Sequence, residues 1–278
     1  MWEKLANIDR RWLYALMIFV IALALIKPIG LAIVPSADTQ KVYDIVEQLP
    51  PGSIVWMGME FSAGGIPELM PAILSMIRQG WKDGRDLRFV CAGMWQMAGD
   101  MAEQAFSTVK AEFPDKEYGV DWVNIGYKPG GEVLLQQYQN SIIETAQGVD
   151  FYGNDLNTLP LMKEFTSLKQ AKLVAIFCTG TPGEKEYIKH VTSPNNIPLI
   201  EAAISVSIPE CMPLVQAGQI KGLVAGMKGA AEYEVLVGAP GSATAGMDAQ
   251  SFSHALIIVF MILGNIGYVL TKNKKQAS

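Results

Sequence analysis

The segment SIVWMGMEFSAGGIPELMPAILSMIRQ, residues 53–79, contains the pattern that decides the fold. An apolar run, Ser53–Met59, is followed by a glycine-containing turn and then by an amphipathic run, Pro67–Gln79. Pro67, with Glu68 behind it, suits the first turn of a helix, where proline loses no hydrogen bond and a negative charge meets the positive end of the helix dipole. The segment therefore predicts a buried strand, a tight turn and a helix.

The same alternation continues through residues 36–252. Further strands are predicted at Leu87–Ala92, Val120–Ile125, Leu173–Cys178 and Leu199–Val206. Further helices are predicted at Thr39–Gln48, Trp95–Phe113, Glu132–Ala146, Glu184–His190 and Pro209–Ala217, with a helix or a strand–helix pair between Ile220 and Val237. Such alternation is typical of βαβ units. We therefore expect one α/β domain over residues 35–252, with a mainly parallel sheet and flanking helices.

An apolar segment precedes this domain. Residues 12–34, WLYALMIFVIALALIKPIGLAIV, contain a single charge, Lys27. About 20 predominantly apolar residues cross a bilayer as a helix. A cleaved signal peptide is the alternative, but its apolar core has about 7–15 residues and ends at an Ala-x-Ala site, which is missing here. We expect an uncleaved transmembrane helix over residues 12–34.

A second apolar segment follows the domain at residues 253–271, SHALIIVFMILGNIGYVLT. It contains Gly264, Asn265 and Gly267, and small or amide side chains often mark a face where one membrane helix packs on another. A span that merely tolerates small residues is the alternative. The preceding residues 237–252 are rich in Gly, Ala and Ser, which predicts a linker.

The charges that flank these segments predict an orientation. Lys4, Arg10 and Arg11 precede the first segment, and Lys272, Lys274 and Lys275 follow the second. Basic residues favour the cytoplasmic side of a membrane. We therefore expect a two-pass protein of the inner cell membrane, with residues 1–11 and 272–278 in the cytoplasm and residues 35–252 outside it.

Composition argues against several classes of function. The formal net charge of −5 does not favour nucleic acid as a partner. The three cysteines, Cys91, Cys178 and Cys211, are too few and too widely spaced to indicate a disulfide framework or a zinc site, and they do not decide the redox compartment. With only His190 and His254 available, a Ser–His or Cys–His hydrolase is disfavoured. We expect no metal and no cofactor.

Three glycine-containing loops follow predicted strands: EFSAGGIPEL (60–69), GYKPGGEVLL (126–135) and CTGTPGEKEY (178–187). In parallel α/β sheets, ligands bind where strands end and helices begin. None of the loops contains GxxxxGK[ST] or GxGxxG, so no nucleotide is specified. Tight turns use the same residue types, which is the alternative explanation. The candidate ligand-binding residues are Ser62, Gly64, Gly65, Gly130, Gly131, Thr179, Gly180, Thr181 and Gly183.

Residues 53–106 also resemble a known family. SAGG at 62–65 and FVCAGMWQMAGDM at 89–101 are similar to the core of signal peptide peptidase A and related ClpP/crotonase-fold proteins. The resemblance implies that Gly64 and Gly65 form an oxyanion loop and that Met97 stands where the nucleophilic serine should be. No serine occurs between Arg85 and Phe106, so the resemblance implies a copy without catalytic activity.

Three functions follow from these patterns. The leading hypothesis is a non-catalytic extracytoplasmic scaffold, either in a homo-oligomer or with other membrane-protein subunits. The second is a small-ligand-binding or sensory domain that uses the glycine-containing loops. The third is a divergent serine or cysteine hydrolase with Ser62 or Cys178 as its nucleophile.

Overall fold

The computed structural model describes residues 9–276, and their side chains as far as residue 269. The side chains of Lys4, Lys272, Lys274 and Lys275, on which the predicted orientation partly depends, lie outside this range. The chain divides into two compact units. One is the α/β unit Ile33–Ala243, and the other combines the two ends of the chain, up to Ala32 and from Thr244 onward.

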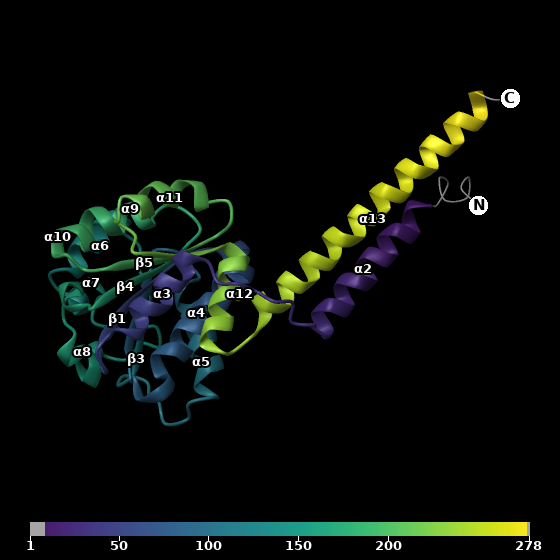
Figure 1. Cartoon of the computed structure of the whole chain (residues 1–278). Helices are drawn as coiled ribbons and strands as arrows, with labels where there is room; N and C mark the ends of the chain where they lie inside the picture. Colours follow the sequence, from purple (N-terminus) through teal and green to yellow (C-terminus); the bar gives the residue numbers. More distant parts are fainter. Residues whose placement is uncertain (1–8, 277–278) are drawn as a thin grey trace. The chain divides into compact units, whose positions relative to one another are not determined.

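The α/β unit contains a six-stranded parallel sheet with helices on both faces (Figure 1), which confirms the predicted fold class. The strand order is β3-β2-β1-β4-β5-β6. The strands are β1 (Ile54–Glu60), β2 (Arg88–Gly93), β3 (Trp122–Tyr127), β4 (Leu173–Cys178), β5 (Leu199–Ala203) and β6 (Gly222–Ala225). Almost every strand residue is buried, as expected for parallel strands covered on both faces. The order is that of doubly wound sheets, in which the direction of winding reverses between β1 and β4.

Two helical layers enclose the sheet. One layer consists of α3 (Ala37–Glu47), α4 (Ile66–Trp81), α5 (Ala98–Lys110) and α12 (Gly226–Val237). The other contains α6 (Glu132–Tyr138), α7 (Ile142–Thr145), α8 (Pro160–Glu164), α9 (Glu184–Tyr187), α10 (Ser193–Asn195) and α11 (Ile208–Gln216). Large side chains join this second layer to the sheet; for example, the Trp56 and Tyr138 rings lie 5.1 Å apart.

In the α/β unit, the predicted strands and helices begin and end within three residues of the predicted positions, except for one helix that is broken in two. The helix expected at Trp95–Phe113 begins at Ala98, because a turn precedes it in which the Ala98 N–H donates to the Trp95 carbonyl. The helix expected at Glu132–Ala146 is broken near Ser141. The Ser141 side chain caps the second piece by accepting a hydrogen bond from the Glu144 N–H.

The N-terminal helix is shorter than predicted. α2 (Arg10–Ile26) has 17 residues and ends before Lys27. Pro28 and Gly30 follow, and Gly30 has a φ of +71°, which an α-helix does not use. The prediction of a transmembrane helix over residues 12–34 is therefore wrong in extent. At a rise of 1.5 Å per residue α2 is about 25 Å long, slightly shorter than a bilayer core of about 30 Å.

The C-terminal helix is longer than predicted. α13 (Ser242–Gln276) has 35 residues, and its Ser242–Val269 portion has a mean hydropathy of 1.9. Among the described residues it is the one helix that is long and apolar enough to cross a membrane by length and composition. Residues 242–252, expected to be part of a linker, form its first turns, because alanine is a strong helix former whatever its frequency in linkers.

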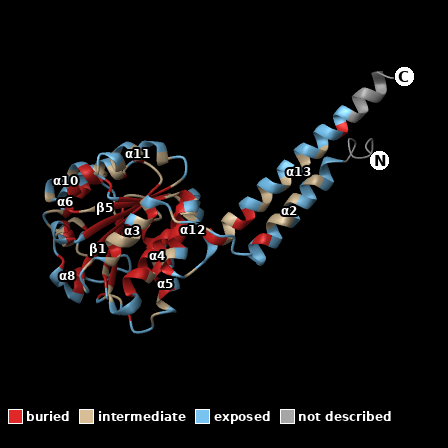
Figure 2. Ribbon diagram, in the orientation of Figure 1, coloured by how far each residue is buried: buried red, intermediate tan, exposed pale blue. Residues whose placement is uncertain are grey.

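Asp248 joins the two parts of the helical unit. Its carboxylate accepts hydrogen bonds from the N–H groups of Ile29 and Gly30 at 2.8 Å and of Leu31 at 3.0 Å. Asp248 is fully buried, although most other side chains of α2 and α13 are exposed (Figure 2). Three backbone donors around one carboxylate fix the segment after α2 against α13.

Candidate functional site

A pocket of about 390 Å³ lies at the ends of β1, β2 and β4, on the side where ligands bind in doubly wound sheets. Because β1 has β2 and β4 as neighbours, the loops that follow these three strands meet there. The lining residues are Phe61, Ser62, Met94, Trp95, Gln96, Met97, Thr181 and Pro182. The pocket therefore occupies the point at which the sheet reverses its winding.

The walls of the pocket are mainly apolar, with a small polar component. Phe61, Pro182, Trp95 and two methionines provide apolar surface, while Ser62, Gln96 and Thr181 bring two hydroxyls and an amide. None of the eight lining residues is charged. Small-molecule sites typically have volumes of about 300–1,000 Å³ and few polar groups among apolar walls, so this pocket falls in that class.

A buried glutamate fixes the β2 loop of the pocket. Glu60, at the end of β1, accepts hydrogen bonds from the Tyr187 hydroxyl and from the Met94 N–H, both at 2.8 Å. Trp56 Nε1 donates to the Tyr187 hydroxyl at 3.3 Å. Burial raises the pKa of Glu60 to about 7, although both hydrogen bonds act to lower it. This network joins β1, α9 and the start of the 94–97 loop.

The predicted loop residues are only partly brought together. Ser62 and Thr181 line the pocket, and Gly65 packs so closely that a Cβ there would lie 2.5 Å from Thr179 Cγ2. Gly130 and Gly131 follow the edge strand β3 and do not line the pocket. Gly64 precedes Gly65 in the turn before α4, and Gly180 and Gly183 lie in the loop after β4.

Residues 94–97 line the pocket but were not among the ligand-binding residues predicted from the sequence. A turn between β2 and α5 was detectable from the segment AGMWQMAG, but the strand order that places it beside the β1 and β4 loops was not. Met97, placed at the serine position by the family resemblance, does line the pocket. The N–H of Gly65 donates to the Ser62 carbonyl at 2.9 Å and so already has a partner.

The predicted helix-packing residues of α13, Gly264, Asn265 and Gly267, do not share one contact surface in the described chain. Gly264 and Asn265 are exposed, whereas Gly267 is buried. The Asn265 amide donates to the Met261 carbonyl of its own helix at 2.8 Å. A Cβ added at Gly264 would meet no atom of the described chain within 4 Å.

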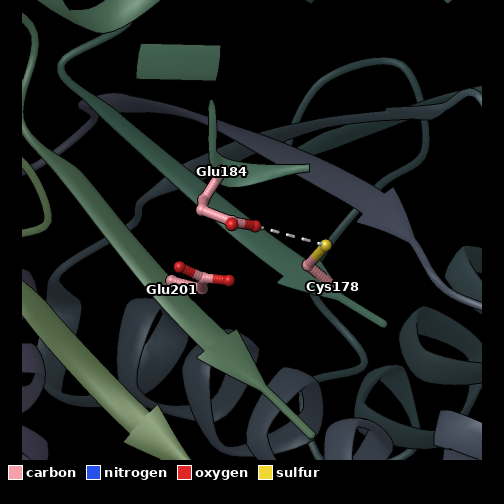
Figure 3. Close-up of side chains that lie close together, drawn as sticks. All are labelled: Cys178, Glu184 and Glu201. Carbon is pink, nitrogen blue, oxygen red and sulfur yellow. Dashed lines mark hydrogen bonds between the residues drawn. The ribbon is translucent and has the colours of Figure 1, made fainter. Parts of the chain in front are cut away.

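A second group of reactive side chains lies at β4 and β5. Ligand atoms of Cys178, Glu184 and Glu201 all lie within 4.8 Å of one another (Figure 3). Burial raises the pKa of the Cys178 thiol, so this cysteine is a poor nucleophile at neutral pH. Burial, followed by the neighbouring Glu184, raises the pKa of Glu201 to about 8.

The histidine nearest to these sites in sequence is engaged elsewhere. His190 Nε2 lies 2.8 Å from Glu132 Oε2, and its Nδ1 lies 3.2 Å from the Gln136 amide. Both ring nitrogens therefore have partners other than Ser62 or Cys178, which gives no support to a hydrolase of the Ser–His or Cys–His type.

Comparison with known proteins finds no match for this chain among protein-family models, curated proteins or solved structures. The strand order alone does not specify a ligand, because one fold carries many functions. The loop after β1 has no GxGxxG. β2 ends at Gly93 and is followed by Met94, so it lacks the carboxylate that holds a ribose in dinucleotide sites. The function of this chain must therefore be inferred from the geometry of the site.

Proposed function

We propose that this chain is a membrane-anchored binding protein whose α/β unit holds a small uncharged molecule in the pocket between the β1, β2 and β4 loops. The pocket at the point of winding reversal is the observation that supports this function. Among the three hypotheses drawn from the sequence, it favours ligand binding, since Ser62 and Thr181 from two predicted loops share one cavity.

The lining suggests the chemistry of the ligand. A charged ligand would lose its hydration without meeting an opposite charge among the eight lining residues, which is costly. A flat, mainly apolar body would pack against Trp95, Phe61 and Pro182. Hydrogen-bonding groups on its edge would meet the Ser62 and Thr181 hydroxyls and the Gln96 amide. An aromatic amide fulfils all of these conditions.

Benzamide, with benzoate and benzylamine as charged analogues, provides the test. Saturation-transfer NMR is recorded on the full chain in detergent micelles, with protein-free micelles as the blank for each ligand, so that uptake by the micelle is subtracted. We expect wild-type protein to transfer saturation to benzamide more strongly than to either ion. Ser62→Trp should fill the pocket and abolish this transfer, while Ser107→Trp, on the exposed face of α5, should leave it unchanged. Equal transfer in the two variants would refute the proposal.

We propose a two-pass anchorage for this binding unit, with both termini in the cytoplasm. α13 provides one span, and α2 with the apolar residues 28–34 provides the other. Arg10 and Arg11 at the start of α2 and the three lysines of residues 272–275, in the last turns of α13, support this orientation. A cysteine introduced at either terminus is expected to react with a membrane-impermeant maleimide only after the cells are lysed. Labelling of intact cells would place that terminus outside.

A second candidate function is assembly with another copy or another membrane subunit. The exposed Gly264 and Asn265 in the apolar helix α13 favour it, because small residues allow close helix approach and amides bond across helices. In lipid nanodiscs we expect a protein mass of at least two chains of 30.3 kDa, falling to one chain in Gly264→Leu. A single chain in the wild type would exclude self-assembly.

A further inference from the structure

Three metal-ligating side chains from separate segments meet beside the loop that follows β4. Cys178 ends β4, Glu184 begins α9, and Glu201 lies in the middle of β5 (Figure 3). The Cys178 Sγ lies 4.0 Å from Glu184 Oε2, and all three ligand atoms are within 4.8 Å of one another. The strand pairing of β4 with β5 fixes two of the three ligands on a rigid sheet.

Glu201 has a free ligand atom in this cluster. The side chain is 2% exposed, and its Oε2 has no hydrogen-bond partner in the described part of the chain. Its other oxygen, Oε1, receives a weak hydrogen bond from the Cys211 thiol at 3.6 Å. A buried carboxylate oxygen without a partner is costly and unusual in a folded protein. A cation bound between Glu201, Cys178 and Glu184 would give this oxygen a partner and would explain why the three side chains lie together.

We propose that Cys178, Glu184 and Glu201 bind one divalent cation of the zinc type. In a tetrahedral zinc site, Zn–S bonds of about 2.3 Å and Zn–O bonds of about 2.0 Å separate sulfur from oxygen by roughly 3.5 Å. The observed 4.0 Å between Cys178 Sγ and Glu184 Oε2 is about half an ångström longer. The other pairs of ligand atoms lie within 4.8 Å, so cation binding requires side-chain rotations that draw the three ligands together.

The type of donor atom determines which cations the site should prefer. A thiolate is a soft ligand that favours zinc and similar transition metals, whereas magnesium and calcium require more oxygen ligands. Three protein ligands leave the fourth tetrahedral position for water or for a bound molecule. The site is therefore expected to take Zn²⁺ or Co²⁺ in preference to Mg²⁺.

The loop between Cys178 and Glu184 allows these two ligands to lie close together. Cys178 and Glu184 stand at the two ends of residues 179–183, and a Cβ added at Gly183 would lie 2.4 Å from Cys178 Sγ. Glycine at this position lets the end of the loop fold back over the thiol. A bound cation would hold both ends of a loop whose Thr181 and Pro182 line the pocket, and this proposal does not depend on what the pocket binds.

Cobalt provides a spectroscopic test, because a thiolate bound to Co²⁺ gives a charge-transfer band in the near ultraviolet. The untagged full chain in detergent is stripped of metal with a chelator and titrated with Co²⁺. We expect one Co²⁺ per chain, a thiolate band, displacement by Zn²⁺ and no displacement by Mg²⁺. Cys178→Ser loses the band. Glu184→Gln binds more weakly by about tenfold or more, since even outer-shell changes have effects of that size.

Glu210→Gln is the matched control, because Glu210 is an exposed carboxylate on α11 whose partner Lys185 neighbours Glu184. It should bind Co²⁺ as the wild type does. Circular dichroism is used to check that each variant is folded. Glu184 is partly exposed, so its replacement by glutamine is compatible with folding. The proposal is overturned if the wild type gives no band, if Cys178→Ser retains it, or if Glu184→Gln and Glu210→Gln bind equally.

Discussion

Two buried glutamates in the same sheet have opposite surroundings. Glu60, at the end of β1, has both carboxylate oxygens hydrogen-bonded, to the Tyr187 hydroxyl and the Met94 N–H. Glu201, in β5, has one oxygen bonded to a thiol, and its other oxygen has no hydrogen-bond partner among the described residues. Both are almost completely buried. The difference indicates that Glu60 holds the fold together around the pocket, whereas Glu201 retains capacity for a ligand.

The largest expected effect concerns Glu60. Glu60→Ala leaves the Met94 N–H and the Tyr187 hydroxyl without acceptors, and unpaired buried groups cost about 1–3 kcal/mol each. We expect the free energy of unfolding to fall by about 3 kcal/mol or more, measured by denaturant titration of the full chain in detergent. A loss below about 1 kcal/mol would show that Glu60 is not a structural support.

Glu201 is expected to show the opposite pattern. Glu201→Gln should change the stability of metal-free protein by less than about 1 kcal/mol, because few hydrogen bonds are lost. Zinc at 100 times its Kd should stabilise the wild type by about 2.7 kcal/mol and leave this variant unaffected. Thermal unfolding with and without Zn²⁺ measures both quantities. Equal stabilisation of wild type and variant would remove the distinction between the two glutamates.

In the helical unit, Asp248 resembles Glu60, because both of its carboxylate oxygens accept hydrogen bonds, here from three backbone N–H groups. Asp248→Ala should free the amides of residues 29–31, at a cost of about 1–3 kcal/mol for charge-assisted hydrogen bonds. Hydrogen exchange at these amides is the measurement, and we expect it to accelerate by about tenfold or more. Ser251→Ala, on an exposed turn of the same helix, serves as the control and should leave exchange unchanged. Slow exchange in Asp248→Ala would contradict the assigned role.

The smallest expected effect is a pH dependence at Glu232, another buried glutamate. Burial raises the pKa of Glu232, but hydrogen bonds from Lys228, Thr39 and Ser36 outweigh it and leave the pKa below 4.5. A carboxylate with a lowered pKa stabilises the fold above its unfolded pKa and loses this contribution as pH falls through the folded value. The stability difference between wild type and Glu232→Gln should therefore shrink below pH 4.5. A difference that stays constant down to pH 3 would contradict this prediction.

Much of the fold was predictable from local sequence. Apolar runs bounded by Gly and Pro predicted β1 to β5, because strands of a parallel sheet are buried on both faces and need little alternation. The extents of α2 and α13 were not predicted correctly. The hydropathy of residues 12–34 does not reveal the break at Pro28 and Gly30, and the alanines of residues 242–252 suit a helix as well as a linker.

The site was less predictable, because it depends on strand order. The loops after β1 and β4 are more than 100 residues apart in sequence, and only the winding reversal places them together. One local signal was available for both glutamates. Glu60 ends the apolar run IVWMGME and Glu201 interrupts LIEAA, and a charged residue within a buried strand is costly unless it has a partner. The sequence does not show what that partner is.

Metal stoichiometry of matched variants tests the contrast between the glutamates most directly. The full chain is equilibrated with Zn²⁺ by dialysis, and the bound metal is counted by mass spectrometry in the wild type, Glu60→Gln and Glu201→Gln. We predict one ion per chain in the wild type and in Glu60→Gln, and none in Glu201→Gln. An ion retained by Glu201→Gln, or none in the wild type, would contradict the account.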